Sequence, residues 1–269
     1  MLQSPALIER REFKYLIDAA TADRIREALR PFCVQDPFSA QAPNGRYQIS
    51  SLYLDTPGLT LHKANEQELL DRYKLRVRYY PDNPVSPVFF EVKGRHHDAI
   101  AKTRGRVGSD WAELLSDPFV AAERVTHDPA VERFVTRVHT LQAVPIVLVQ
   151  YQREAWTSLI DDYARITFDT VVESQPARSW SFERTQDRWR ANDDPQTQSS
   201  DRGSAIVLEL KFTRDVPSWL MAMVQRLNLS RRSFSKYGTS IEIWRESGLT
   251  LGSHGALPVV APTRRTEAA

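Results

Sequence analysis

The chain has 269 residues, of which 41% are hydrophobic, and this is enough for one large globular core. The 36 Lys and Arg residues nearly balance the 34 Asp and Glu residues, so the net charge of +2 carries no nucleic-acid signature. A single cysteine, Cys33, excludes an intramolecular disulfide and a cysteine metal site. No signal peptide and no run of about 20 apolar residues is visible, so a cytoplasmic protein without a membrane span is expected.

The predicted elements alternate between strands and helices along the whole chain. Residues 8–17 are expected to form the first strand, and Thr21 can cap a helix that runs to Leu29. Further strands are predicted at residues 46–56, 68–80, 86–95, 99–107, 144–158, 162–174 and 204–214. Further helices are predicted at residues 59–65, 110–116, 129–142, 216–228 and 235–246.

The remaining stretches are interpreted as loops and tails. Residues 34–45 hold two prolines and a glycine and are predicted to be a loop. The polar stretch 176–203 is interpreted as a loop or lid inserted into a domain that spans residues 8–246. Residues 1–7 are expected to be an N-terminal tail, and residues 247–269 a disordered C-terminal tail.

Basic side chains recur at every second position on several of the predicted strands. Because residues i and i+2 of a strand share one face, Lys74, Arg76 and Arg78 lie together with apolar residues opposite. Other strands repeat the pattern with Arg10, Glu12 and Lys14; Glu91 and Lys93; Lys102, Arg104 and Arg106; Tyr151 and Arg153; Arg165, Thr167 and Asp169; and Glu209 and Lys211. A solvated sheet face would explain any one of these strands. Three like charges in a row, as in Lys74, Arg76 and Arg78, repel one another unless an anion lies among them. This repulsion and the recurrence of charged faces on seven strands favour an anion-binding face.

This charged face is expected to point inward. The predicted helices at 21–29, 129–142 and 216–228 can cover the apolar face from outside, which makes the fold an α+β barrel with a polar, basic lumen. One Arg side chain can donate two parallel hydrogen bonds to phosphate oxygens, and a Lys side chain supplies a point charge. Carboxylates bind hard divalent cations such as Mg²⁺. The pattern therefore indicates a linear triphosphate or polyphosphate bound together with a divalent metal.

The ordered succession of motifs resembles a known family. The strand Arg10-Arg11-Glu12-Phe13-Lys14-Tyr15 is similar to the opening motif of the triphosphate tunnel metalloenzymes, a CYTH-like superfamily. It is most similar to the VTC domain, the polyphosphate polymerase domain of the vacuolar transporter chaperone complex. The later matches are residues 51–56, 74–79, 91–93, 102–104, 151–153, 165–169, 209–211 and 235–237. The resemblance covers about residues 8–245 and rests on the order of the motifs.

The resemblance implies a tunnel of eight antiparallel strands that holds a triphosphate or a polyphosphate chain. The catalytic residues that it implies are Arg76, Arg78, Lys93, Arg153 and Lys236. Further substrate contacts are predicted for Lys14, Lys74, Lys102, Arg104, Tyr151, Arg165, Lys211 and Ser235. Mn²⁺ or Mg²⁺ is expected on Glu209, with Glu12 and Glu91 as further candidates that could instead pair with a neighbouring Arg or Lys.

The implied activity is transfer of the γ-phosphate of ATP to a polyphosphate chain. Arg10 stands where hydrolases of the superfamily carry their first glutamate, and this favours the polymerase branch. Two alternatives stay open: an inorganic or nucleoside triphosphatase, and a binding module for polyphosphate or nucleotides without turnover. Expected ligands are ATP or another nucleoside triphosphate, polyphosphate, pyrophosphate and triphosphate. Nucleic acid is not expected, because the basic strands carry no interleaved aromatic platform. The related polymerase works within a membrane complex, so coupling to transport would need a membrane-protein partner.

Overall fold

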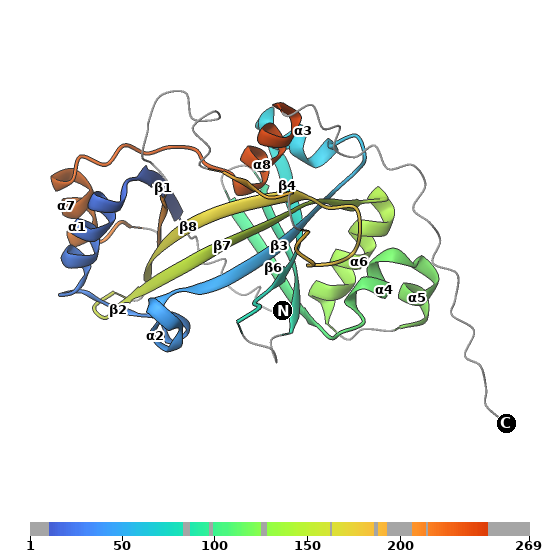
Figure 1. Ribbon diagram of the computed structural model, residues 1–269, viewed down its shortest axis with the longest axis horizontal. Coiled ribbons are helices and arrows are strands. Elements are labelled where there is room, and N and C mark those ends of the chain that lie inside the picture. Colours follow the sequence, from blue (N-terminus) through green and yellow to red (C-terminus); the bar gives the residue numbers. More distant parts are fainter. Residues whose placement is uncertain are drawn as a thin grey trace, which may run out of the picture.

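The computed structural model describes residues 11–82, 87–96, 99–124, 128–161, 163–185, 188–192, 206–213 and 215–246 (Figure 1). Its centre is an antiparallel sheet in which eight strands follow the order β1-β10-β8-β7-β3-β4-β5-β6. These are β1 (Arg11–Ile17), β3 (Tyr47–Asp55), β4 (Asp71–Tyr79), β5 (Val88–His96), β6 (Ala99–Val107), β7 (Val144–Ser158), β8 (Ala164–Pro176) and β10 (Ile206–Phe212). Short strands β2 (Cys33–Gln35) and β9 (Arg190–Ala191) pair with β7 and β8. The predicted α+β class and antiparallel sheet are confirmed.

The predicted closed barrel is wrong. Among the described residues, β1 and β6 are the two ends of the strand path and do not pair with each other. The sheet instead curls until side chains near its two ends meet, and Lys93 Nζ on β5 lies 2.9 Å from the Glu12 carboxylate on β1. Side-chain alternation specifies the two faces of a strand, whereas closure depends on strand tilt and stagger, which alternation does not specify.

Helices cover the outer, apolar face of the sheet at both ends, as predicted. At one end α1 (Ala19–Leu29) and α7 (Ser218–Arg226) lie side by side, and their Ile25 and Leu220 are buried against Leu208 and Phe168 (Figure 1). At the other end lie α4 (Trp111–Ser116), α5 (Pro118–Glu123) and α6 (Pro129–Leu141). Phe134 of α6 stacks on Phe90 of β5 in this core. Each fully buried side chain of this size stabilises the fold by roughly 1.5–3 kcal/mol.

The inner face of the sheet is divided into an apolar and a polar part. Helix α8 (Lys236–Glu246) covers the apolar part, where Ile241 and Trp244 pack against Val149 and Val207. Helix α3 (Thr60–Glu66) lies beside α8 (Figure 1). The buried Asp55 carboxylate joins both helices, because it accepts hydrogen bonds from the first turn of α3 and, at 2.7 Å, from the Tyr237 hydroxyl of α8.

A bulge in β8 marks the boundary between the two parts. Val171 has a φ of 49°, and the pairing of β7 with β8 shifts register at the same point. A positive φ is unusual for a β-branched residue. The extra residue reverses the alternation, so that Asp169 before the bulge faces the polar part while Val172 after it packs on α8. The bulge therefore lets one strand serve both parts.

The stretch predicted as a loop at 34–45 contains structure. It holds β2, the short helix α2 (Pro37–Gln41) and a 3-10 turn at Pro43–Gly45. The Asp36 side chain caps α2 by accepting from the Ser39 N–H.

In the described residues of the predicted insertion 176–203, Trp180, Phe182 and Trp189 pack against the core under α4 and α6. The predicted tails 1–7 and 247–269 lie outside the described residues. None of the described helices has the length and apolar character needed to traverse a bilayer.

Candidate anion-binding site

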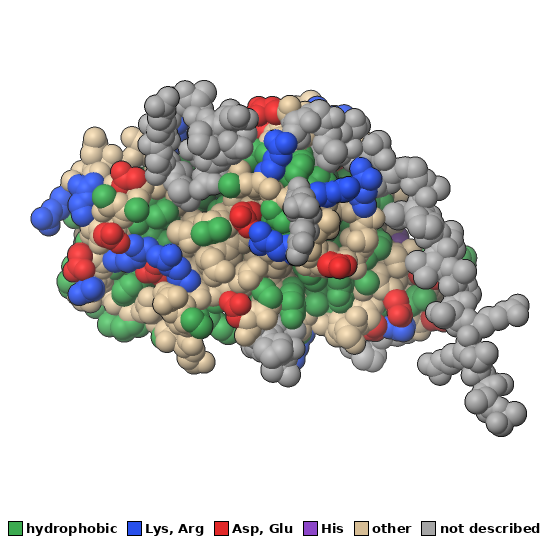
Figure 2. Space-filling model, in the orientation of Figure 1, with side chains coloured by type: hydrophobic (Ala, Val, Ile, Leu, Met, Phe, Trp, Pro, Cys, Tyr) green, Lys and Arg blue, Asp and Glu red, His purple; other side chains and the backbone are tan. Residues whose placement is uncertain are grey.

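A cavity of about 640 Å³ lies against the polar part of the inner face, and we call it the central cavity. Every residue to which the sequence assigned a role in binding or catalysis lines it, except Glu91. Its lining includes twelve basic residues: Arg11, Lys14, Lys74, Arg76, Arg78, Lys93, Lys102, Arg104, Arg153, Arg165, Lys211 and Lys236. Among the described residues, its carboxylates are those of Glu12 and Glu209. On the face of the molecule shown in Figure 2, by contrast, basic and acidic side chains are interspersed.

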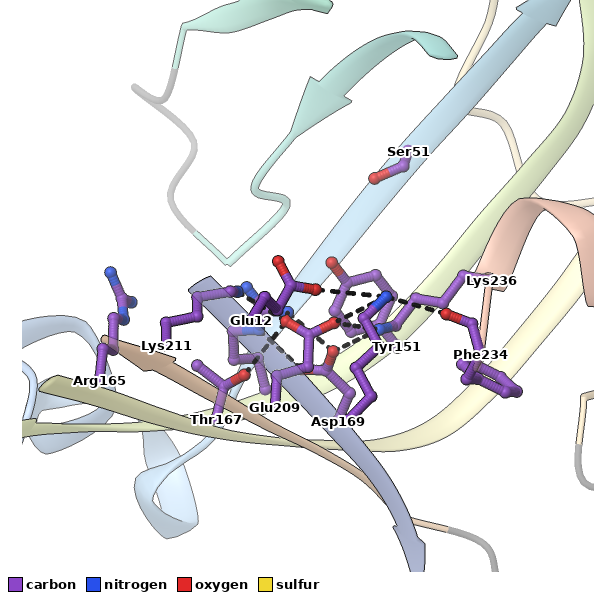
Figure 3. Close-up of polar contacts among 12 residues, drawn as sticks. Glu12, Ser51, Tyr151, Arg165, Thr167, Asp169, Glu209, Lys211, Phe234 and Lys236 are labelled. Atoms are coloured by element: carbon purple, nitrogen blue, oxygen red, sulfur yellow. Dashed lines mark hydrogen bonds and ion pairs between the residues drawn. The ribbon is translucent and has the colours of Figure 1, made fainter. Parts of the chain in front are cut away.

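Glu209 on β10 lies at the centre of the cations in Figure 3. Its carboxylate is 2.6 Å from Lys211 Nζ, 3.4 Å from Lys236 Nζ and 3.5 Å from an Arg153 nitrogen. Burial by itself would raise the pKa of Glu209, but Lys211 and Lys236 hold this pKa well below its ordinary value. The carboxylate is therefore ionised at neutral pH.

Asp169 is a site residue to which the sequence gave no role. Arg153 grips it with two hydrogen bonds, from Nε at 2.6 Å and from a terminal nitrogen at 2.7 Å, and Lys236 Nζ lies 2.5 Å away. Although burial disfavours the charged lysine, Asp169 and Glu209 together raise the pKa of Lys236. Alternation had placed Asp169 on the same face as Arg165, and the pairing of β7 with β8 sets it opposite Arg153. Asp169 thus fixes two of the predicted phosphate contacts in place.

Glu91 is fully buried behind the cavity wall. Its carboxylate lies 2.7 Å from Arg76 Nε, 2.9 Å from Lys102 Nζ, 3.4 Å from Arg104 Nε and 3.7 Å from an Arg78 nitrogen. Burial alone would raise the pKa of Glu91, but Arg76 and Arg78 lower it strongly. Glu91 is the shared counter-ion of four cations, which is the pairing that the sequence had left open for it.

Hydroxyl groups hold the two central arginines. Arg78 donates to the Tyr151 hydroxyl at 3.1 Å and to Ser51 at 3.3 Å, and Arg76 donates to the Tyr53 hydroxyl at 3.4 Å. These tyrosines also line the cavity, although Tyr53 had no predicted role in binding. A guanidinium that is already oriented loses less conformational freedom when it binds an anion.

Lysines gather where the cavity passes the segment before α8. Lys74 Nζ donates to the Ser235 hydroxyl at 2.8 Å, and Lys14 Nζ donates to the Phe234 carbonyl at 2.8 Å. Burial, together with Lys14, Lys93 and other nearby cations, lowers the pKa of Lys74 to about 7. A polyanion at this point would favour the charged form of this lysine.

The opposite end of the cavity combines arginines with aromatic rings. The Arg104 guanidinium lies 3.6 Å from the ring centroid of Phe89 and donates to the Tyr80 hydroxyl. Arg165 is paired with Asp36 at 2.6 Å, and Figure 3 shows it apart from the cluster around Glu209. Four further lining residues were not predicted: Arg11, Tyr47, Tyr80 and Tyr163.

The predicted metal ligands fit a divalent ion in part. Within the described residues, no group of three or more His, Cys, Asp and Glu side chains is arranged to hold a metal. Glu12 and Glu209 do face the same cavity. Burial and the neighbouring Glu209 act to raise the pKa of Glu12, but Lys211, Lys93 and Lys14 lower it to about 2. Mg²⁺ is commonly bound by one or two carboxylates together with substrate phosphates, so this pair suits an ion that arrives with a phosphate ligand.

The charge balance of the cavity determines which ligands it can hold. Twelve cations against two carboxylates, with two more carboxylates behind them, leave a large positive excess. Such an excess in a partly enclosed site is stabilised by a ligand with several negative charges. The distribution of these cations over seven strands and α8 suits a linear polyanion.

The family model of the VTC domain matches residues 9–245. The chain belongs to the VTC domain family. The resemblance inferred from the ordered motifs is thereby confirmed, and the match spans all the strands of this VTC domain. A search of curated proteins found no match.

Solved structures with a similar chain path include three proteins of low sequence identity. A putative adenylate cyclase (bh2851) from Bacillus halodurans has 14% identity and a TM-score of 0.46, over 85% of this chain and 94% of its own. The PH1819 protein from Pyrococcus horikoshii OT3 has 12% identity and a TM-score of 0.45, over 87% and 99%. The putative adenylyl cyclase HpAC1 from Hippeastrum, described as having a dominant triphosphatase activity, has 12% identity and a TM-score of 0.48, over 92% and 100%.

Proposed function

We propose that this VTC domain binds the triphosphate of ATP in its central cavity and transfers the γ-phosphoryl group to a polyphosphate chain. The observation that carries the proposal is the lining of this cavity, where twelve cations from seven strands and α8 face two carboxylates. Membership of the VTC domain family supports the same reaction. In this proposal the cavity serves as the tunnel, and the protein acts in the cytoplasm, where ATP is available.

The transfer needs positioning and charge rather than a protein base. A terminal phosphate oxygen of the chain, already ionised, attacks the γ-phosphorus, and the bond from that phosphorus to the β-bridging oxygen breaks to release ADP. Arg76, Arg78 and Arg153 would neutralise the charge on the transferring group, and Lys236 would hold the phosphate beside them. A bound Mn²⁺ or Mg²⁺ on Glu209 and Glu12 would supply further neutralisation of phosphate oxygens.

The test is turnover of ATP with Mn²⁺ by purified protein, with the products resolved on a gel and released phosphate measured. The proposal predicts growing polyphosphate chains and ADP. Removal of one such charge costs on the order of 2–4 kcal/mol in the barrier, so Arg76→Ala and Glu209→Ala should lose roughly 30- to 1,000-fold in rate.

Other outcomes of the same assay select the alternatives. Release of orthophosphate from tripolyphosphate without chain growth would identify a triphosphatase. Tight, salt-sensitive polyphosphate binding without turnover, over a broad screen of metals and nucleotides, would identify a binding module.

A further inference from the structure

A second and larger cavity, of about 840 Å³, lies beside α3 and α8, and we call it the vestibule. It shares Glu12, Lys14, Lys74, Lys93 and Ser235 with the central cavity, so the two cavities adjoin at these residues. Its volume lies within the range of about 300–1,000 Å³ that is typical of small-molecule sites. None of the predicted roles involves the part of the vestibule beyond the shared residues.

The charge of the lining changes from one cavity to the other. Beyond the shared residues, the vestibule lining described here carries three carboxylates, of Glu66, Glu68 and Glu242, and three arginines. Glu66 on α3 and Glu242 on α8 face each other closely enough that Glu66 adds to burial in raising the pKa of Glu242. A phosphate chain gains little in a charge-balanced space whose carboxylates repel it.

The other groups of the vestibule suit a neutral, polar and partly aromatic ligand. The ring of Phe234 and the buried ring of His62 line it. His62 Nε2 makes no hydrogen bond, although it lies 3.3 Å from the Glu66 carboxylate. Carboxylates accept hydrogen bonds from ribose hydroxyls and base amino groups, and aromatic faces stack on bases. Lysines stand at the junction with the central cavity, where the phosphates of such a ligand would begin.

We propose that the vestibule binds the ribonucleoside part of a nucleoside triphosphate, with Glu66 and Glu242 as hydrogen-bond acceptors. The triphosphate then runs past Lys14, Lys74 and Lys93 into the central cavity. The end of that cavity near Arg104 and Arg165 is left for the acceptor chain. This inference rests on the proposed function, because it needs the triphosphate to lie in the central cavity.

The test compares ATP with inorganic tripolyphosphate as ligands of a double variant, Glu66→Gln with Glu242→Gln. Calorimetric titrations are made without divalent metal, so that neither carboxylate acts through an ion and ATP is not consumed. Loss of two negative charges favours any polyanion, so tripolyphosphate should bind the double variant as tightly as the wild type or more tightly. ATP should bind roughly ten-fold more weakly, because hydrogen bonds to ionised acceptors are lost.

The matched control is the double variant Glu27→Gln with Glu123→Gln, which makes the same change of charge at exposed positions on α1 and α5. This control should leave both affinities, for ATP and for tripolyphosphate, unchanged from the wild type. If ATP binds the vestibule variant as tightly as it binds the wild type, or more tightly, the nucleoside site is overturned while the proposed function stands. If neither ligand binds the wild type, with or without Mn²⁺, the proposed function fails as well.

Discussion

The Glu91 carboxylate is fully buried among four cations, each within 4.0 Å. Its removal leaves positive charges facing one another without a counter-ion, and loss of one partner of a buried ion pair typically costs 3–5 kcal/mol. We predict that Glu91→Gln lowers the free energy of unfolding by about 3 kcal/mol, measured by urea denaturation.

A surface ion pair provides the control for this prediction. Glu27 pairs with Arg30 at 3.0 Å, and both side chains are about two-thirds exposed, so Glu27→Gln should cost less than about 1 kcal/mol. If Glu91→Gln retained wild-type stability and instead required much more Mn²⁺ for turnover, Glu91 would be a metal ligand rather than a counter-ion.

Lys74 gives a prediction for pH. Its folded pKa of about 7 lies below the ordinary lysine value of 10.5. Between these two values the unfolded chain binds more protons, so Lys74 makes the free protein more stable as pH rises through this window. A bound polyanion reverses the preference and recharges the amine. We predict that tripolyphosphate binding takes up protons at pH 8 and takes up far fewer at pH 6, measured by calorimetry in buffers of different ionisation enthalpy.

The variant Lys74→Arg separates the contribution of Lys74 to proton uptake from that of the neighbouring lysines. Arginine stays charged at all these pH values, so the variant should take up fewer protons at pH 8. Lys102 keeps a share of the uptake, because burial and the nearby Arg76 lower its pKa to about 8 in spite of Glu91. An unchanged uptake in the variant would contradict the assignment to Lys74.

At the scale of elements, Asp55 holds α3 and α8 against β3. Its carboxylate accepts from three backbone N–H groups and from the Tyr237 hydroxyl. Tyr237→Phe removes one of these bonds and should cost about 1 kcal/mol of stability, whereas Asp55→Ala leaves buried donors unpaired and should cost roughly 3 kcal/mol. Tripolyphosphate binding should weaken in the same order, because α8 begins with Lys236.

The order of effects is the informative result for this pair of variants. Tyr79→Phe is a matched control, since that ring packs against Phe182 on the outer side of the sheet and should change stability by less than about 0.5 kcal/mol. Equal effects of Tyr237→Phe and Tyr79→Phe would show that the bond to Asp55 does not position α8.

The main strands and the longer helices could be predicted because their side-chain periods are strong. The eight predicted strands and six predicted helices correspond to observed elements, with ends that differ by a few residues. The short helices α2 and α5 were missed, although each begins with an Asp-Pro pair in which Asp caps the helix and Pro occupies its first turn. Their few residues carry too little periodicity to stand out.

At the scale of the whole molecule, the residues around the cavity could be predicted from the sequence, whereas the burial of each of them could not. Alternation showed which side chains share a face of a strand, and the order of the family's motifs along the chain showed which strands belong to one domain. Burial depends on neighbours that are distant in sequence, so Glu12 and Glu91 looked alike, yet Glu12 lines the central cavity and Glu91 lies behind it. Asp169 was passed over for the same reason, because its partner Arg153 comes from the adjacent strand.

The vestibule could not be predicted from strand patterns. It is built from α3, α8 and the segment before α8 together with β1, β4 and β5, and no pattern within a single strand indicates this assembly. Its carboxylates come from α3, at Glu66, and from α8, at Glu242, which are far apart in the sequence.

The central claim is that a linear polyanion lies in the central cavity. The most direct measurement is a crystal structure of the protein with tripolyphosphate. We predict phosphate groups within hydrogen-bond distance of Arg76, Arg78, Arg153 and Lys236, with Glu91 and Asp169 still paired behind them. Tripolyphosphate bound elsewhere, or a central cavity without phosphate at saturating ligand, would contradict the account.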